Sequence, residues 1–462
     1  MDEQLISSIV EKVVKNIEKQ NAPKRLNGVF DTMEEALAAV SKAYKEFRSY
    51  SVEQREQMIS NIRRLTLEEA EEMARLGVEE TGMGRVSDKI IKHQLVAKKT
   101  PGTEDLQPTV KTGDDGLTLI EMAPFGIIGS ITPSTNPSET VLCNSMGMIA
   151  GGNAVVFNPH PNACKTANYA VDLVNRAILE AGGPENLVVS VYKPTMDTSN
   201  TMMNCPAVKM LVATGGPGVV KTLLSSGKKA IGAGAGNPPV IVDETADVKK
   251  AGIDIVNGAS FDNNLPCIAE KECFVVKTVA DELIKSMTEN GAYLIRGNDI
   301  DKLVKVALVE KNGKYVINKN YVGRDARKFL EAIGITGVDP RLIICETDEM
   351  HPFVQTELMM PILAIVRVND IDEAIDMACR AEAGRRHSAH IHSKNIDNLT
   401  RFAREVETTI FVKNAPSYAG IGAGGEGYTT FTIAGPTGEG LTATHSFTRQ
   451  RRCVMADGLH IV

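Results

Sequence analysis

The chain has 462 residues, of which 43% are hydrophobic and 24% are charged. This composition is typical of globular proteins and excludes disorder over most of the chain, and the length predicts about three domains, or two large ones and a small one. The formal net charge of −7 excludes a general nucleic-acid-binding role, which needs a basic face, and no apolar run approaches the roughly 18 residues that span a bilayer.

The first 20 residues have the pattern of an amphipathic helix and a linker. Their apolar side chains recur at helical spacing, at Leu5, Ile6, Ile9, Val10, Val13, Val14 and Ile17. A detached helix cannot bury such a stripe by itself, so it either docks on another chain or packs on its own domain. The segment holds no signal-peptide core, so we expect a cytoplasmic protein.

The next helix is predicted to begin after Thr32, because T-M-E-E (32–35) has the pattern of a capping box. Residues 33–80 are predicted to be mostly helical. From residue 117 onward, short apolar runs alternate with segments of helical length such as 162–181 and 247–258. The apolar runs, which we expect to be strands, are 126–131, 153–157, 187–191, 209–213, 239–242, 273–277, 341–345, 362–367 and 408–412. This alternation predicts an α/β fold with mainly parallel sheets, and G-N-P-P-V at 236–240 indicates a boundary between two α/β domains.

Two turns from a strand into a helix are candidate ligand sites. In the segment 123–140 a strand is followed by T-P-S-T-N-P, with a helix predicted to begin at Pro137. Such turns point backbone N–H groups at a ligand, although Asn136 could instead be a plain helix N-cap. The second turn, A-T-G-G-P-G (213–218), has glycines that let a phosphate approach the backbone, and an ordinary turn remains the alternative.

Isolated polar residues give weaker signals. The eight cysteines form no C-x-x-C pair, so neither a structural zinc site nor a thioredoxin motif is indicated. Cys267 lies in a loop before a strand and is either a nucleophile or a core residue, whereas Cys273 opens an apolar strand and is predicted to be structural. Glu357, just before another apolar strand, would alone be a surface or cap residue. The motif H-S-A-H-I-H (387–392) has no third metal ligand at a sensible spacing, so a strand is favoured over a metal site.

Taken in order, these motifs resemble the aldehyde dehydrogenase superfamily, and more narrowly its CoA-acylating branch, the propionaldehyde and acetaldehyde dehydrogenases. The resemblance covers nearly the whole chain. It rests on E-T-G-M-G-R (80–85), T-P-S-T-N-P (132–137), G-A-G-A-G-N-P-P-V-I-V-D-E-T-A-D (232–247), G-A-S-F-D-N-N (258–264), T-E-L-M-M-P (356–361) and P-T-G-E-G (436–440). It implies oxidation of a short-chain aldehyde, propionaldehyde ahead of acetaldehyde, to an acyl-CoA, with NAD as cofactor and coenzyme A as co-substrate. A hydrolytic NAD(P)-dependent enzyme that makes the free acid, an acyl phosphate reductase and a non-enzymatic shell-associated protein remain alternatives.

The resemblance also implies roles for individual residues. Cys267 stands where the family has its thiol nucleophile, Asn136 where it has the oxyanion asparagine, and Glu357 where a glutamate holds the nicotinamide ribose. The remaining residues implied in cofactor binding are Thr132, Pro133, Ser134, Asn158, His160, Thr214, Gly215 and Gly216. No metal is implied.

Two departures from the hydrolytic enzymes bear on the reaction. Those enzymes carry E-L-G-G-K-x-P, and an ungapped alignment on Pro238 places Gly232 at the glutamate and Gly236 at the lysine. Hydrolysis of a thioester needs a base to activate water, whereas a coenzyme thiol is already a few per cent thiolate near pH 7. We therefore expect no carboxylate beside Cys267 to recruit water. In the second departure Asn158 replaces a lysine that contacts the adenosine ribose, which leaves NAD against NADP open.

The resemblance implies the domain layout and the partners as well. The expected parts are a targeting helix and linker (1–20), a Rossmann-type dinucleotide-binding domain (24–108, 122–237 and 420–444), an α/β catalytic domain (238–419) and a small β extension for oligomerisation (109–121 and 445–462). Within the extension, T-R-Q-R-R-C-V (448–454) is predicted to be an edge strand with basic side chains outward. We expect a homo-oligomer, dimer or tetramer, with residues 1–19 bound to a shell or core protein of a bacterial microcompartment, and no nucleic-acid or membrane partner.

Overall fold

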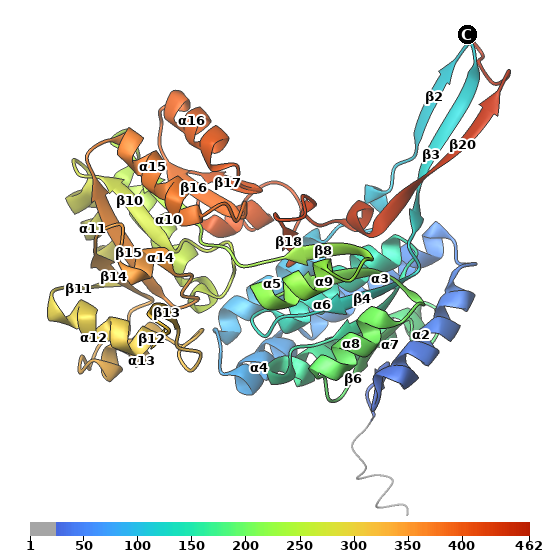
Figure 1. The fold of residues 1–462 in the computed structure, drawn as a ribbon, viewed down its shortest axis with the longest axis horizontal. Helices are drawn as coiled ribbons and strands as arrows, with labels where there is room; N and C mark the ends of the chain where they lie inside the picture. Colours follow the sequence, from blue (N-terminus) through green and yellow to red (C-terminus); the bar gives the residue numbers. More distant parts are fainter. Residues whose placement is uncertain (1–24) are drawn as a thin grey trace, which may run out of the picture.

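The structure is a computed structural model and describes residues 25–462. Figure 1 shows two α/β bodies side by side, with a thin three-stranded arm rising from one of them. The predicted N-terminal amphipathic helix lies outside the described residues. Within the part that is described, no helix is both long and apolar enough to cross a membrane.

The first body is built on a parallel sheet with strand order β1-β6-β5-β4-β7-β8. Its strands are β1 (Val29–Phe30), β4 (Ile127–Ile131), β5 (Ala154–Asn158), β6 (Val188–Val191), β7 (Val208–Thr214) and β8 (Lys229–Ala233). Its helices are α2 (Met33–Phe47), α3 (Val52–Glu68), α4 (Ala70–Thr81), α5 (Val86–Lys99), α6 (Pro137–Ala150), α7 (Cys164–Glu180), α8 (Met196–Asn204) and α9 (Pro217–Leu224). Helices α2 and α8 pack together on one face of the sheet, and α6 and α7 pack on the other. The central strands β4, β5 and β6 are largely apolar and buried because both faces of the sheet are covered.

The second body holds a parallel sheet with strand order β11-β14-β15-β10-β9-β16-β17. Its strands are β9 (Pro239–Val242), β10 (Glu272–Val276), β11 (Ala292–Ile295), β14 (Leu342–Glu346), β15 (Ile362–Val368), β16 (Ser388–His392) and β17 (Ile410–Lys413). Its helices are α10 (Val248–Ser260), α11 (Ala280–Glu289), α12 (Asn298–Ala307), α13 (Ala326–Ala332), α14 (Pro352–Gln355), α15 (Ile371–Glu382) and α16 (Ile396–Val406), with a hairpin of β12 (Leu308–Lys311) and β13 (Lys314–Ile317). The chain passes from the first sheet to the second between β8 and β9.

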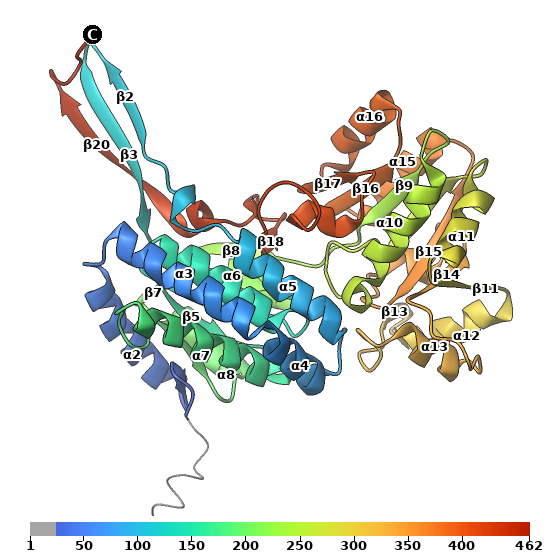
Figure 2. The same cartoon turned by 180° about the vertical axis from the view of Figure 1, so that it is seen from behind.

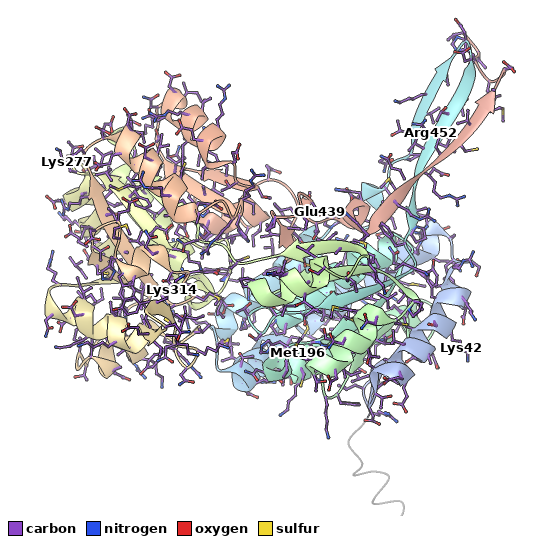
Figure 3. The ribbon with its side chains drawn as sticks, viewed as in Figure 1. Lys42, Met196, Lys277, Lys314, Glu439 and Arg452 are labelled. Atoms are coloured by element: carbon purple, nitrogen blue, oxygen red, sulfur yellow. The ribbon has the colours of Figure 1, made fainter. Side chains whose placement is uncertain are left out.

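The arm is a separate antiparallel sheet seen from behind in Figure 2. It consists of β2 (Thr109–Gly113), β3 (Gly116–Pro124) and β20 (Thr448–Ala456), with β3 in the middle. The predicted edge strand at 448–454 is therefore confirmed, and Arg452 is one of its exposed basic residues on the arm (Figure 3). A short pair, β18 (Ile433–Ala434) and β19 (Gly440–Leu441), returns the chain to the first body, where β18 packs near β8.

The predicted α/β class with parallel sheets is confirmed. Each of the nine apolar runs contains a strand, and the helix at Pro137 begins at that residue. The capping box is also present, since Glu35 N donates to Thr32 Oγ1 at 3.3 Å and Thr32 N to Glu35 Oε2 at 3.2 Å. Among the strands of the two parallel sheets, the sequence patterns missed β1, β8 and β11, which are short. Five short 3-10 helices complete the described chain: η1 (Thr103–Asp105), η2 (Pro161–Ala163), η3 (Phe261–Asn264), η4 (Ser417–Ile421) and η5 (Thr444–Phe447).

Candidate active site

The expected cofactor residues lie along the carboxyl edge of the first sheet. Three neighbouring strands end there: Thr132, Pro133 and Ser134 follow β4, Asn158 ends β5 with His160 beyond it, and Thr214 ends β7 before Gly215 and Gly216. Strand order reverses at β4, because β5 and β6 lie on one side of it and β7 and β8 on the other. Ligands of open α/β sheets bind at such a reversal.

The turn after β7 leaves its backbone open to a ligand. A Cβ added at Gly215, Gly216 or Gly218 would meet no atom within 4 Å, so the packing of the chain does not itself require glycine there. Thr132 Oγ1, at the end of the neighbouring strand, is buried without a hydrogen-bond partner. An exposed backbone before a helix and an unused hydroxyl beside it suit the phosphates of a dinucleotide.

Two of the residues expected to bind the cofactor make side-chain hydrogen bonds within the protein. Asn158 is only 5% exposed, and its Oδ1 accepts a hydrogen bond from Thr198 Oγ1 at 2.7 Å. Thr214 Oγ1 is hydrogen-bonded to Thr432 Oγ1 at 2.8 Å, which ties the turn to the returning segment before β18. His160 is exposed, and its Nδ1 accepts from the N–H of Asn162 at 3.1 Å. The structure therefore brings these residues to one edge, but it turns the side-chain amide of Asn158 inward.

The second sheet contributes its amino edge. His387, Gly236, Cys267 and Glu357 precede β16, β9, β10 and β15, which are adjacent parallel strands. A Cβ at Gly236 would lie 2.8 Å from the carbonyl oxygen of Cys267 and 3.0 Å from Cγ of His387. The N–H of Gly236 donates to Glu357 Oε1 at 3.4 Å. Four segments that are far apart in the sequence thus meet around Cys267.

The loop that carries Cys267 is held rigidly. Asp262, Asn263 and Asn264 have consecutive positive φ angles of 46°, 55° and 65°, a conformation that aspartate and asparagine tolerate better than most residues. Lys271 Nζ donates to Asn264 Oδ1 at 2.6 Å and to the Asn264 carbonyl at 2.9 Å. Between residues 258 and 276 only Cys267 is not fully buried. It also packs against the core of the first body, so it lies where the two bodies meet.

The environment of the thiol keeps it protonated. Burial raises the pKa of Cys267 most, and the charge of Glu357 raises it further, whereas Lys271 and backbone N–H groups lower it. The result is a pKa of about 12. Glu357, which the fold brings to the same sheet edge, is thus a carboxylate that acts on the thiol through its charge, while the expectation that no carboxylate recruits water beside Cys267 stays a prediction.

A side chain at position 232 would not face the Cys267 thiol. Gly232 lies in β8, and a Cβ there would meet Val220 Cγ1 in α9 at 2.7 Å. The position that abuts Cys267 is Gly236. The ungapped alignment with the hydrolytic motif therefore put the missing carboxylate on a side chain that would point at α9, and the close packing around Gly236 is what keeps a side chain away from the thiol.

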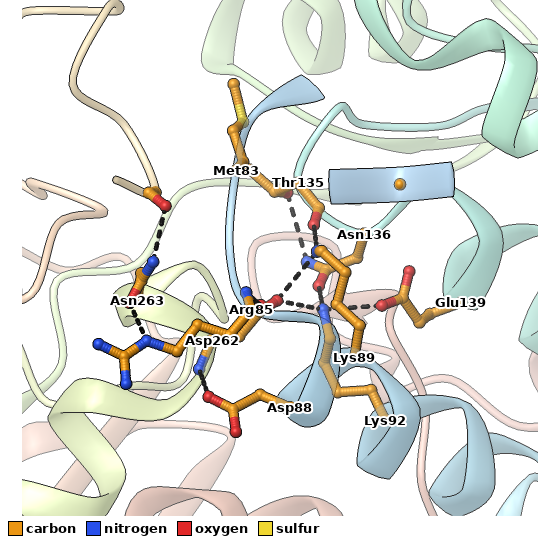
Figure 4. A network of polar contacts seen from close by, with 12 residues as sticks. Met83, Arg85, Asp88, Lys89, Lys92, Thr135, Asn136, Glu139, Asp262 and Asn263 are labelled. Carbon is orange, nitrogen blue, oxygen red and sulfur yellow. Dashed lines mark hydrogen bonds and ion pairs between the residues drawn. The ribbon is translucent and has the colours of Figure 1, made fainter. Parts of the chain in front are cut away.

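Asn136 is not a plain helix cap. It stands at the N-cap of α6, but its side chain makes no capping hydrogen bond. Instead its Oδ1 accepts from Lys92 Nζ at 2.6 Å, and its Nδ2 donates to Thr135 Oγ1 at 3.3 Å (Figure 4). One N–H of the amide is left for another acceptor.

The cluster around Asn136 was missed by sequence reasoning. Lys89 and Lys92 on α5 are buried against Glu139 and Asp262, with Lys92 Nζ at 2.7 Å from Glu139 Oε1 and 2.6 Å from Asp262 Oδ2. Burial raises the pKa of Glu139, but the opposing charge of Lys92, aided by His93 and Lys89, lowers it to about 2. The available signal was the helical spacing of D-K-x-x-K-H (88–93), whose charges would ordinarily be assigned to solvent.

The H-S-A-H-I-H segment is the strand β16, as predicted. Its three histidines are buried, and burial lowers the pKa of His387 to about 3, that of His390 to about 4 and that of His392 to about 3. His390 Nε2 is hydrogen-bonded to the carbonyl of Ile268 at 2.9 Å, which supports the residue after Cys267. Among residues 25–462 no group of three or more His, Cys, Asp or Glu side chains could hold a metal ion.

Comparison with known proteins gives consistent matches. The family model described as "Aldehyde dehydrogenase family" matches residues 27–432. The acetylating acetaldehyde dehydrogenase EutE of Salmonella typhimurium is 46% identical and is matched over 100% of both chains. The CoA-propanoylating propanal dehydrogenase of the same organism is 46% identical over 94% of this chain and 93% of its own length.

Solved structures agree in fold over nearly the same span. A propionaldehyde dehydrogenase from the fucose utilisation bacterial microcompartment of Clostridium phytofermentans has a TM-score of 0.92 and 56% identity, covering 94% of this chain and 100% of that one. The propionaldehyde dehydrogenase of Rhodopseudomonas palustris, solved with bound CoA and an acylated cysteine, has a TM-score of 0.92 and 52% identity, covering 94% and 99%.

Proposed function

This chain belongs to the aldehyde dehydrogenase family, and from that premise we propose that it oxidises a short-chain aldehyde, propionaldehyde first, to the acyl-CoA. The balanced reaction consumes the aldehyde, coenzyme A and NAD⁺ and yields the acyl-CoA, NADH and a proton. The observation that carries the proposal is the placement of Cys267, partly accessible in an otherwise buried loop, at the junction of the two bodies.

Cys267 and Asn136 would carry out the first half of the reaction. The deprotonated sulfur of Cys267 attacks the aldehyde carbon, and the negative charge that develops on oxygen is stabilised by the free N–H of the Asn136 amide and by the backbone N–H of Cys267. Loss of one such donor typically costs about 3 kcal/mol of transition-state stabilisation. Loss of hydride from the carbon leaves a thioester on Cys267.

The carboxyl edge of the first sheet would hold the dinucleotide. Thr132 and the Gly215–Gly216 backbone at that edge, together with Glu357 from the second sheet, would bind it, and when bound it supplies the acceptor for the hydride. Glu357 is oriented by the N–H of Gly236 at 3.4 Å, and Arg385 Nη1 lies 4.0 Å from its other oxygen.

Cys267 would act as the leaving group in the second half. The thiol of coenzyme A attacks the thioester carbon, and Cys267 departs as the thiolate. Acyl transfer to a thiol requires less base assistance than hydrolysis does. The tight packing at Gly236 excludes a side chain that could activate water from that position. A hydrolytic enzyme remains the second candidate, favoured only by the presence of Glu357 near the thiol.

The deciding experiment follows NADH formation at 340 nm with propionaldehyde, with and without coenzyme A. We expect sustained turnover and propionyl-CoA only when coenzyme A is present, and we expect Cys267→Ser to abolish both. Steady turnover without coenzyme A, accompanied by propionate, would favour the hydrolytic reaction instead. A Cys267→Ser variant with wild-type rate would refute the assignment of the nucleophile.

We also propose that the chain works as a homo-oligomer inside a bacterial microcompartment in the cytoplasm, with residues 1–19 bound to a shell or core protein. The origin of the Clostridium phytofermentans structure in such a compartment supports this location. Deletion of residues 1–20 should leave kcat unchanged and prevent co-sedimentation with purified compartments. Loss of folding on that deletion would instead indicate that the segment is part of the domain.

A further inference from the structure

Lys92 lies at the centre of the polar cluster in Figure 4, between the two bodies. Its side chain is completely buried, and Nζ lies 2.6 Å from Asn136 Oδ1, 2.6 Å from Asp262 Oδ2 and 2.7 Å from Glu139 Oε1. An ammonium group has three N–H donors and no acceptor. Lys92 therefore donates a hydrogen bond to Asn136 and forms ion pairs with two carboxylates, all within the protein.

This arrangement fixes the orientation of the Asn136 amide. Because the ammonium group can only donate, the amide must present Oδ1 to Lys92 and turn Nδ2 away from it. A cation on the amide oxygen also polarises the amide and strengthens its N–H groups as donors. One of these N–H groups is the proposed partner of the substrate oxygen.

The same ammonium group also anchors the loop of the nucleophile. Asp262 precedes Cys267 in the loop of positive φ angles. Its Oδ2 forms an ion pair with Lys92 Nζ at 2.6 Å, and its Oδ1 accepts from the N–H of Arg85 at 2.8 Å. The N–H of Asp262 in turn donates to Asp88 Oδ2 at 2.9 Å. Lys92 Nζ thus contacts both the Asn136 amide and the segment that leads to Cys267, and Asp262 Oδ2 also accepts from Lys89 Nζ at 3.1 Å.

We propose that Lys92 is a positioning residue for the oxyanion site, acting through the Asn136 amide without touching the substrate. This inference rests on the function proposed above. It predicts that Lys92 affects the step in which charge develops on oxygen, and leaves the binding of coenzyme A unchanged.

Lys89 provides a matched control. It lies on the same helix, is 3% exposed, and contacts the same carboxylate, with Nζ 3.1 Å from Asp262 Oδ2. Its other hydrogen bond, at 3.5 Å, goes to the backbone carbonyl of Thr135 and not to the Asn136 side chain. Lys89→Met therefore removes an equally buried charge from the cluster without releasing the amide.

The experiment is a double-mutant cycle on kcat for aldehyde oxidation. Asn136→Ala should lower kcat by about 10²–10³-fold, as expected for loss of an oxyanion donor. Lys92→Met should lower kcat by about 10–100-fold, because the amide remains but is misoriented, with the KM for coenzyme A unchanged. Lys89→Met should have a kcat near that of the wild type. In the Asn136→Ala background, adding Lys92→Met should have little further effect, because a residue that acts through Asn136 has nothing left to position.

The proposal is overturned if the kcat losses of Asn136→Ala and Lys92→Met multiply in the double variant. It is also overturned if Lys92→Met and Lys89→Met lower kcat equally. Lys92→Met leaves Asp262 and Glu139 facing one fewer cation. If this variant does not fold, the charge-balanced variant Lys92→Met/Glu139→Gln, compared with Glu139→Gln alone, replaces it in the cycle. The wild-type assay separates this inference from the function on which it rests. Absence of CoA-dependent turnover in the wild type refutes the function, whereas multiplying defects in an active enzyme refute only the role of Lys92.

Discussion

At the scale of single residues, the thiol of Cys267 lies in the field of a carboxylate and an ammonium group. Glu357 raises its pKa and Lys271 lowers it, while burial raises it most. Below a pKa of about 12 the thiolate fraction increases tenfold for each unit of pH. The free enzyme should therefore react slowly with electrophiles at neutral pH, and the ionised sulfur must be generated during the catalytic cycle.

Glu357→Gln should make Cys267 more reactive. Removing the negative charge lowers the pKa of the thiol, so iodoacetamide should alkylate Cys267 up to about tenfold faster at pH 8, because one pKa unit changes the thiolate fraction tenfold. In both proteins the logarithm of the rate should increase by one per pH unit between pH 7 and 9. Peptide mapping by mass spectrometry measures the rate, and Cys267→Ser identifies the labelled site. An unchanged or slower rate in Glu357→Gln would show that Glu357 does not act on the thiol.

Gly236→Ala should lower kcat because its Cβ would lie 2.8 Å from the Cys267 carbonyl oxygen, which has to move. A displacement of this kind next to a nucleophile can cost about 10²-fold in rate. Gly234→Ala is the control, since its Cβ would meet only Pro436 Cγ at 4.0 Å. Steady-state kinetics of both variants measure the effect, and equal kcat values would mean that the loop adapts without cost.

At the scale of elements, the candidate site is formed by loops at the ends of strands. This explains why part of the site can be predicted from the sequence. The apolar runs before Thr132 and Thr214 and after Cys267 and Glu357 mark β4, β7, β10 and β15, so the loops could be assigned from local patterns. The sequence could not predict that the side chain of Asn158 turns inward or that Lys92 is buried. Lys92 and Asn136 are 44 residues apart, and a charge on a helix is ordinarily assigned to solvent until its partners are known.

The cap of α2 gives a prediction at this scale. Thr32→Ala removes the hydroxyl that accepts the N–H of Glu35 at 3.3 Å, and it should lower the free energy of unfolding by about 1 kcal/mol. Urea unfolding followed by circular dichroism measures this loss. Thr32 takes no part in the contacts described for the site, so kcat and KM should not change. A kinetic change would mean that α2 is coupled to the strand ends.

At the scale of the whole molecule, the arm combines exposed strand edges with exposed apolar side chains. Its outer strands β2 and β20 each have one unpaired edge, and Val110, Val454 and Met455 are 53%, 62% and 50% exposed. Exposed strand edges with apolar side chains are typical places for one chain to meet another. This supports the proposed homo-oligomer.

Val454→Lys should therefore reduce the oligomer. A charge in the middle of the interface is costly to bury, so light scattering coupled to gel filtration should show a lower molar mass at equal concentration. Ile396→Lys is the control, because Ile396 is 66% exposed on α16, away from the arm. If both variants keep the wild-type mass, the arm does not form the interface.

The ion cluster beneath Asn136 also constrains how ligands enter and leave. Separating the two bodies at that seam would remove Asp262 from both Lys92 and Lys89 and leave its buried charge without a cation, a penalty of about 3–5 kcal/mol. We therefore expect no hinge at this seam, so that aldehyde and coenzyme A reach Cys267 without a separation of the two bodies. The acyl group bound to Cys267 would then allow one reactant to leave before the other binds.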